Sequence, residues 1–194
     1  MAGPYSITNP VQGQPISSSG FGIGVKNAIN DLDSRTGALE SGSQLVTKRG
    51  HRTTNTGNIT TTETPILRLD DCPVRAGTII QVSSSPLNLD TSVANDIASV
   101  KIRYKYSTVT GVPATIADGY MGQMRLSIPD ITNGPLVPLN MFYYAGADGF
   151  LSILLTAVRV SGTGNIVIVG ASFDPIDMVI QDLGVDPGAT GVNL

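Results

Sequence analysis

The sequence predicts a mainly β protein: an antiparallel β-sandwich of jelly-roll type, preceded by an extended N-terminal arm and one short helix. Three observations support this prediction. The composition is 41% hydrophobic and only 14% charged, which is typical of an ordered chain. Short apolar runs separated by turn residues follow one another over most of the chain. The first 41 residues differ from the rest, first in their prolines and glycines and then in a helical pattern.

Residues 1–20 are expected to form an extended arm, because Pro4, Pro10 and Pro15 fix φ and favour extended geometry in the residues before them. Chain ends are commonly mobile tails, whereas a tail in solvent has no need of apolar side chains. The alternative is an arm that lies along the surface of a partner. The candidate contact residues are Tyr5, Ile7, Pro10, Val11, Ile16 and Phe21.

Residues 21–41 are expected to form a helix that ends before Gly42. Apolar side chains at heptad-like spacings of four and three, interrupted by Thr36, form one stripe. The stripe consists of Val25, Ile29, Leu32 and Leu39. A helix of this length is marginal alone in water, so it packs either on its own domain or against copies of itself. The stripe is shorter than three heptads, and the sequence leaves both alternatives open.

Residues 42–59 are polar and are expected to form a hinge, and residues 60–194 form the head domain. The clearest strand is Val100–Tyr106, where apolar and basic residues alternate strictly. Turn signals such as Asn133-Gly134 and Asp148-Gly149 separate the candidates. The expected strands are 66–69, 78–83, 100–106, 120–128, 138–144, 151–161, 165–173 and 176–183. About eight short strands without intervening helices are typical of an antiparallel sandwich.

The last strands are apolar on both faces, as in FLSILLTAV (150–158) and NIVIVGASF (165–173). A sandwich that stands alone normally has one polar face, and large exposed apolar patches are rare on monomers. The pattern therefore predicts that strands between Leu151 and Leu183 contribute to a subunit interface.

No set of residues in the sequence indicates catalysis or a cofactor. His51 and Cys72 are the sole histidine and cysteine, too few for the usual zinc ligands or for a disulfide. Asp70, Asp71, Asp90 and Asp96 lie in segments expected to be loops, where aspartate commonly supports turns. A carbohydrate-active enzyme would need a paired acid and base and usually aromatic sugar platforms, but tryptophan is absent and aromatics make up 5% of the chain. The chain is therefore expected not to be an enzyme and to bind no metal.

Charge and hydropathy point away from nucleic acid and membranes as partners. The net charge is −3, and the basic group at Lys48, Arg49 and Arg52 has no interleaved aromatic residues. The N-terminus lacks the basic start and apolar run of a signal peptide. The most apolar stretch, 150–160, is too short to span a bilayer.

Two blocks of sequence resemble small structural proteins of tailed phages that infect actinobacteria. The first, ITNPVQGQPISSSGFGIGVKNAINDLDSRTGALES, contains a G-x-P-I-S stretch that leads into an AINDL-x-x-R-x-x-ALE helix. The second, TTTETPILRLDDCPVRAGTIIQVSSSPLNLDTSVANDIASVKIRYKYS, is similar to the head domain of those proteins. Together they cover about residues 6–41 and 60–107.

This resemblance implies a virion protein with a jelly-roll head similar to tumour-necrosis-factor-like trimers. The function it favours is capsid decoration, on the outer capsid surface of particles assembled in the host cytoplasm. The arm would bind the major capsid protein, and helix and head would form a homotrimer. The alternative is a tail fibre, receptor-binding or collar protein. The short chain favours decoration, because a receptor-binding fibre usually needs a longer shaft.

Overall fold

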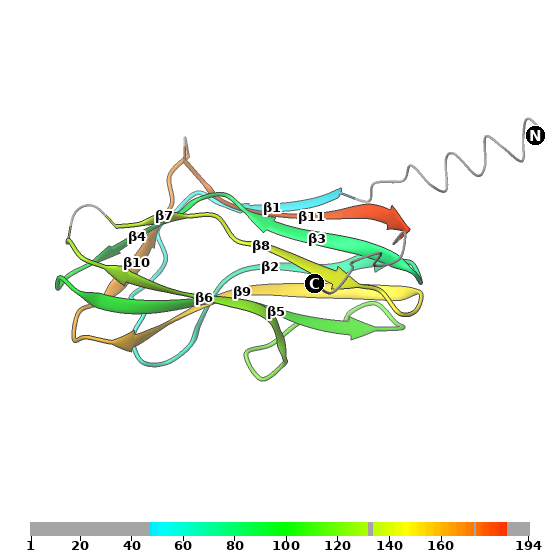
Figure 1. Ribbon diagram of the computed structural model, residues 1–194, viewed down its shortest axis with the longest axis horizontal. Coiled ribbons are helices and arrows are strands. Elements are labelled where there is room, and N and C mark those ends of the chain that lie inside the picture. The colour runs from blue at the N-terminus through cyan, green and yellow to red at the C-terminus, as the bar shows by residue number, and fades with distance from the viewer. Residues whose placement is uncertain (1–46, 132–133, 173, 186–194) are drawn as a thin grey trace, which may run out of the picture. The chain divides into compact units, whose positions relative to one another are not determined.

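The computed structural model describes residues 47–131, 134–172 and 174–185, which all fall in the second of the chain's two units, Gln44–Leu194. These residues form antiparallel strands in two facing layers (Figure 1), and no helix occurs among them. The predicted arm and helix lie outside the described residues. The strands are β1 (Thr47–Arg52), β2 (Thr64–Val74), β3 (Thr78–Ser84), β4 (Leu87–Thr91), β5 (Asp96–Ser107), β6 (Tyr120–Ile128), β7 (Leu136–Val137), β8 (Asn140–Tyr144), β9 (Gly149–Ser161), β10 (Ile166–Val169) and β11 (Ile176–Val185).

Each layer contains a four-stranded sheet. One has the order β1-β11-β3-β8 and the other the order β2-β9-β5-β6. A small sheet, β10-β4-β7, is formed by strands that directly precede or follow members of the first layer in the chain. Early strands pair with late ones: β1 with β11, β2 with β9, and β3 with β8, while β5 and β6 are neighbours in sequence. The chain therefore has the connectivity of one long antiparallel hairpin folded over on itself.

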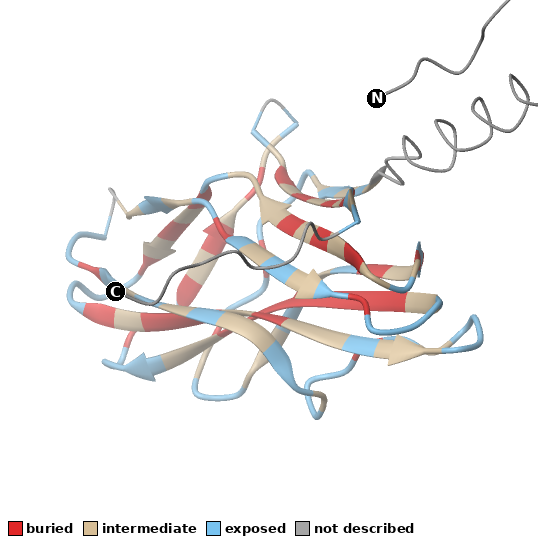
Figure 2. Ribbon diagram, turned by 45° about the vertical axis from the view of Figure 1, so that its right-hand side comes forward, coloured by how far each residue is buried: buried red, intermediate tan, exposed pale blue. Residues whose placement is uncertain are grey.

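The core lies between the two layers and is built by alternation along the strands. On β5, Val100 and Ile102 are fully buried, whereas Lys101 and Arg103 face outwards. Tyr104 and Tyr106 continue the inward face and pack against the core. The alternation predicted for 100–106 is therefore confirmed. Figure 2 shows buried residues along the strands and exposed ones mainly in the loops.

Every predicted strand overlaps an observed one, but the sequence missed β1, β4 and the two-residue strand β7. Thr47–Arg52, expected within the hinge, pairs along its length with β11. This strand lies at the edge of its sheet, and backbone pairing there tolerates polar residues. Leu87–Thr91 was missed although Leu87, Leu89 and Thr91 are buried and alternate with half-buried residues, which is the pattern of a strand with one buried face.

Strand β9 is buried on both faces within a single copy of the chain. Leu151 through Ala157 are all buried. On the outer face, the Ser152 hydroxyl donates to the Val112 carbonyl oxygen at 2.9 Å, and the Thr156 hydroxyl donates to Glu63 at 2.6 Å. The loop after β5 and the segment before β2 thus cover this face. The apolar run on β9 is therefore explained within one copy of the chain, so it no longer supports the predicted subunit interface, which stays a prediction.

Candidate functional site

The residues predicted to bind partners lie outside the described residues, so the structure does not place them. They are the arm residues Tyr5, Ile7, Pro10, Val11, Ile16 and Phe21 and the helix residues Val25, Ile29, Leu32 and Leu39. The described residues belong to the head, so any interaction surface that they form lies on the head itself.

Strand β8 offers such a surface, because it lies at the edge of its sheet and alternates between large side chains. Phe142 and Tyr144 point outwards, and each is 58% exposed. Met141 and Tyr143 point towards the other layer and are only partly buried. Edge strands of monomers commonly carry charged residues or proline that block association, and β8 has neither.

The other layer also places an aromatic side chain, that of Tyr104, against β8. The rings of Tyr104 and Tyr143 lie with their centroids 5.4 Å apart and tilted by 53°. Met141 packs directly against Gly122 of β6, where a Cβ atom would overlap its sulfur. Burial raises the pKa of the Tyr143 phenol, and the neighbouring Tyr104 and Tyr106 add to that shift. Tyr143 is therefore neutral at physiological pH.

We call this surface the aromatic edge. It consists of Tyr104, Met121, Met141, Phe142, Tyr143 and Tyr144. Aromatic residues and methionine are enriched in protein interfaces, and tyrosine and phenylalanine provide large contact areas at a low cost in conformational entropy. The aromatic edge thus has the composition of a contact surface.

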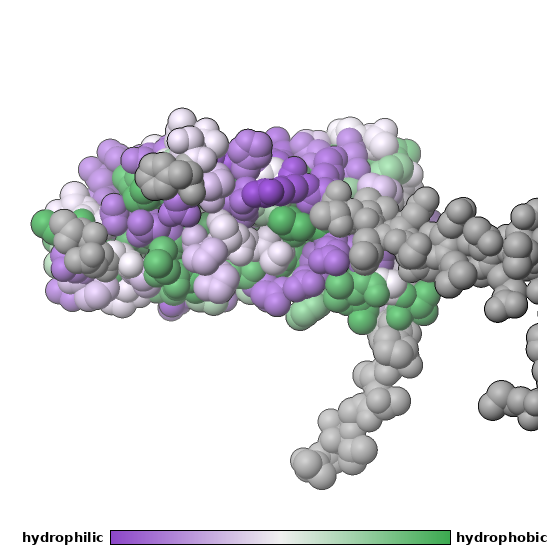
Figure 3. All heavy atoms as spheres, turned by 90° about the horizontal axis from the view of Figure 1, so that it is seen from above, coloured by the Kyte–Doolittle hydropathy of each residue, from purple (hydrophilic) through white to green (hydrophobic). Residues whose placement is uncertain are grey.

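The outer face of the same sheet, on β3 and β11, extends the aromatic edge. Ile79 pairs with Tyr144, and Gln81, whose amide donates to Asn140 at 2.9 Å, pairs with Phe142. Leu183 and Val185 at the end of β11 are exposed as well. Figure 3 looks onto this face and shows hydrophobic side chains among hydrophilic ones, with several gathered at its right-hand end. Arg49 and Asp177 form an ion pair on this face, so its charges partly neutralise each other.

The outer face of the opposite layer is charged and internally paired. Glu63 accepts hydrogen bonds from Lys101 at 2.8 Å and from the Arg103 guanidinium at 2.5 and 2.7 Å. The hydrogen bonds from Arg103, Lys101 and Thr156 lower the pKa of Glu63 to about 2 against the opposing effect of burial. This network fastens the segment before β2 onto β5 and β9. The Glu63 carboxylate has no free site for chemistry, since both of its oxygens already accept hydrogen bonds.

The residues weighed for chemistry from sequence do not come together. His51 is exposed on β1, and Cys72 is buried on β2, where burial raises the pKa of its thiol to about 11. Asp70 and Asp71 lie at a bulge within β2 rather than in a loop, and Asp71 accepts from the backbone N–H of Gly111 at 2.9 Å. Among the described residues, no three histidine, cysteine, aspartate or glutamate side chains form a group that could hold a metal ion.

Asp90 and Asp96 also differ from the loop placement expected for them. Asp90 lies on β4, and Asp96 begins β5 and is fully buried. Asp96 accepts hydrogen bonds from the Thr91 hydroxyl and, at 3.2 Å, from the Gly164 N–H. It therefore joins the β4–β5 turn to the β9–β10 turn.

The part of the chain that the structure describes contains no helix with the length and apolarity needed to cross a membrane.

Sequence reasoning missed the aromatic edge, although the strand 138–144 was predicted. The signal available was the run Met141-Phe142-Tyr143-Tyr144, in which both faces of one strand carry large side chains. The β9 segment shows a similar pattern, so the sequence alone could not distinguish the strand covered by its own chain from the exposed one.

Comparisons with known proteins give only distant similarities. No family model matches the chain, and no curated protein sequence matches it. Among solved structures, an Eiger tumour necrosis factor from S. frugiperda is similar with a TM-score of 0.34 and 12% identity, over 77% of this chain and 99% of that one. The VP2 subviral particle of infectious bursal disease virus is similar with a TM-score of 0.37 and 11% identity, over 76% of this chain and 39% of that one. At this level of similarity neither protein assigns a family or a function to the chain.

Proposed function

We propose that the chain is a non-enzymatic structural subunit of a virion, a decoration protein on the outer surface of a phage capsid. In this proposal three copies associate through the aromatic edge and the helix at 21–41, and residues 1–20 bind the major capsid protein. The two sequence blocks that resemble structural proteins of tailed actinobacteriophages support the virion assignment. The single structural observation that carries the self-association is the aromatic edge.

The proposal includes a jelly-roll head. Its support is the strand order, in which β1-β11-β3-β8 faces β2-β9-β5-β6. If β3 with β4, β7 with β8, and β10 with β11 are each taken as one span, the chain has eight spans. The first pairs with the last, the second with the seventh, the third with the sixth, and the fourth with the fifth. An eight-stranded double sheet built in this way is the jelly-roll arrangement.

Trimer formation would remove exposed aromatic surface from water. Full burial of a large apolar side chain contributes about 1.5–3 kcal/mol, and Phe142 and Tyr144 are each 58% exposed. Each of them can therefore contribute about 1–2 kcal/mol per copy on association. A closed ring uses two different surfaces of every copy, so the aromatic edge would meet another face of its neighbour.

The first experiment measures the mass of the full-length chain by sedimentation. A trimer is expected, and the double variant Phe142→Ser, Tyr144→Ser is expected to dissociate at concentrations where the parent chain stays trimeric. The matched control is Val109→Ser, Ile116→Ser, which removes two exposed apolar side chains from the loop after β5. A monomeric parent chain contradicts the trimer, and an undiminished trimer in the aromatic variant contradicts the role of the aromatic edge.

The second experiment locates the chain on particles. Gold-labelled antibody against the chain is applied to virions of an actinobacteriophage whose genome encodes it. Labelling over the whole capsid is expected. Labelling at the tail alone would contradict decoration and favour the tail fibre, receptor-binding or collar alternative.

A further inference from the structure

A hollow of about 380 Å³ lies on the outer face of the small sheet β10-β4-β7, and the aromatic edge does not involve it. Val167 and Val169 of β10 and Asp90 of β4 line it, together with residues of the segment before β2. Val167 lies opposite Asp90 in the pairing of the two strands. These three side chains face outwards because their neighbours along the strands, such as Ile168, are buried in the core.

The segment 55–59 forms the second wall and is held firmly against β10. The Thr56 N–H donates to the Ile168 carbonyl at 3.0 Å, and the Ile59 N–H donates to the Ile166 carbonyl at 2.7 Å. The Ile168 N–H in turn donates to the Thr56 hydroxyl at 2.9 Å. The side chains of Thr56 and Ile59 are buried, which leaves the exposed Asn55 and Asn58 to line the hollow. Its wall is therefore preorganised by backbone pairing.

Several polar groups around the hollow are available to a ligand. The carboxylate of Asp90 and the side-chain amides of Asn58 and Asn165 have no hydrogen-bond partner within the described residues. The side-chain amide oxygen Oδ1 of Asn55 accepts from the Gly170 N–H at 3.0 Å, so the side-chain NH₂ group of Asn55 remains available. Asn165 is fixed by its backbone N–H, which donates to the Ser92 hydroxyl at 2.8 Å.

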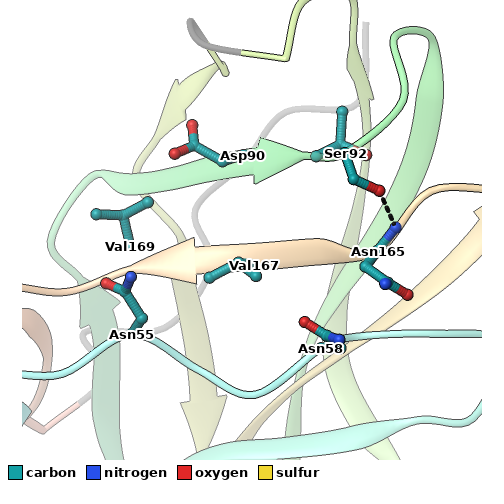
Figure 4. A pocket seen from close by; sticks show the side chains of 8 residues that line it. Asn55, Asn58, Asp90, Ser92, Asn165, Val167 and Val169 are labelled. Atoms are coloured by element: carbon teal, nitrogen blue, oxygen red, sulfur yellow. Dashed lines mark hydrogen bonds between the residues drawn. The ribbon is translucent and has the colours of Figure 1, made fainter.

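Figure 4 shows how these groups are distributed. Asn58 and Asn165 lie at one end of the hollow, Asn55 and Val169 lie at the other, and Val167 is between them. The wall thus offers amide donors and acceptors on both sides of an apolar centre, with the acceptor Asp90 on the neighbouring strand.

This combination matches a polyhydroxylated, uncharged molecule. An amide both donates and accepts, and a carboxylate accepts only, so together they suit adjacent hydroxyl groups, which also donate and accept. The two valines supply an apolar contact for the C–H face of a sugar ring. The lining contains no basic side chain that would attract an anion. One carboxylate is too few for calcium, which takes six to eight oxygen ligands. The volume lies within the usual range for small-ligand sites.

We propose that this hollow binds a neutral saccharide. The aromatic platforms common in sugar sites are absent from its lining, and Val167 and Val169 take that role. The site does not depend on trimerisation or on capsid binding, because one copy of the chain supplies all of the lining. A decoration protein with this site would carry a glycan-binding surface on its head.

The test uses the full-length chain and saturation-transfer difference NMR with a panel of neutral methyl glycosides: glucopyranoside, mannopyranoside, galactopyranoside and arabinofuranoside. Saturable binding is expected for at least one of them, with a dissociation constant of about 1–10 mM, typical of a few exposed hydrogen bonds. The double variant Asn58→Ala, Asn165→Ala is expected to weaken binding by about tenfold or more, since two hydrogen bonds are lost. Asn140→Ala, which alters an exposed asparagine on β8, is the matched control and is expected to bind as the parent does.

Three results would overturn the proposal. One is the absence of saturation transfer with every glycoside of the panel. Another is binding that the double variant retains in full, since the saccharide would then sit elsewhere. The last is calorimetric binding of Ca²⁺ that is lost in the variant while no glycoside binds, which would make the hollow a cation site. Thermal unfolding of both variants shows that any loss of binding is not a loss of folding.

Discussion

The Glu63 network provides a direct test of the electrostatics of the head. The Glu63 side chain is 14% exposed, and the side chains of Lys101 and Arg103 are 16% and 12% exposed. Glu63→Gln keeps the shape of the side chain but removes its charge, which leaves two partly buried cations without their counter-ion. Loss of one partner from a buried pair is costly because the remaining charge is uncompensated.

The size of the effect follows from the pKa of Glu63, which the network lowers from 4.5 to about 2. Since one pKa unit corresponds to about 1.4 kcal/mol, the charged form contributes about 3 kcal/mol to the free energy of unfolding. Because the pKa is lower in the folded state, this contribution is complete above the unfolded-state pKa. It is lost as the pH falls from about 4.5 to about 2.

Urea unfolding of parent and variant at one protein concentration, between pH 7 and pH 2, measures this contribution. Glu63→Gln is expected to be less stable by about 2–3 kcal/mol at pH 7 and nearly equal to the parent at pH 2. Lys105→Gln is the control, because the pair of Lys105 with Asp118 is solvent-exposed on the lysine side and such pairs contribute less than about 1 kcal/mol. An equal gap at both pH values, or no gap at pH 7, would refute the reasoning.

Further predictions concern packing and reactivity. Gly164→Ala is expected to destabilise the head by about 1–3 kcal/mol in urea unfolding, because a Cβ there would lie 2.7 Å from the Thr91 hydroxyl and 2.8 Å from the Val93 nitrogen. The control Gly57→Ala, with open space around it, is expected to change stability by less than about 0.5 kcal/mol. Similar losses of stability for both variants would contradict this prediction. Cys72 is 1% exposed, and burial raises the pKa of its thiol to about 11. A disulfide reagent at pH 8 is therefore expected to modify Cys72 at least about a hundredfold more slowly than free cysteine. Rapid labelling of the folded protein would disprove the burial argument.

The sequence predicted the strands better than their partners. Val100–Tyr106 could be predicted because one strand with one buried face produces its own alternation. The pairing of Thr47 with Gln181 could not be predicted, because it joins residues far apart in the chain and depends on backbone atoms that every residue has. For the same reason TKRGHR was expected to be a hinge, although it forms an edge strand.

The hollow shows the same limit at the level of a site. Asn58, Asp90 and Asn165 are separated by long stretches of sequence, and each alone is an ordinary turn or surface residue. Only the pairing of β10 with β4 and with the segment 55–59 brings them to one surface. Asp90 was weighed from sequence as a possible acid or base, but in the structure it lies beside amides and valines, where it can accept hydrogen bonds from a ligand.

Apolar side chains can form an interface only where the chain itself does not cover them. By hydrophobicity alone, β9 was the stronger candidate, because Ile153, Leu154 and Leu155 are more apolar than the tyrosines of β8. Yet the loop after β5 and the Glu63 network cover the outer face of β9, and nothing in the described part of the head covers Phe142 and Tyr144. Apolar residues that are already buried gain nothing from a partner, whereas exposed ones do. In the proposed trimer, the driving force for association of the heads would therefore come from the aromatic edge, which lies on the opposite side of the sandwich from the strand that the sequence favoured.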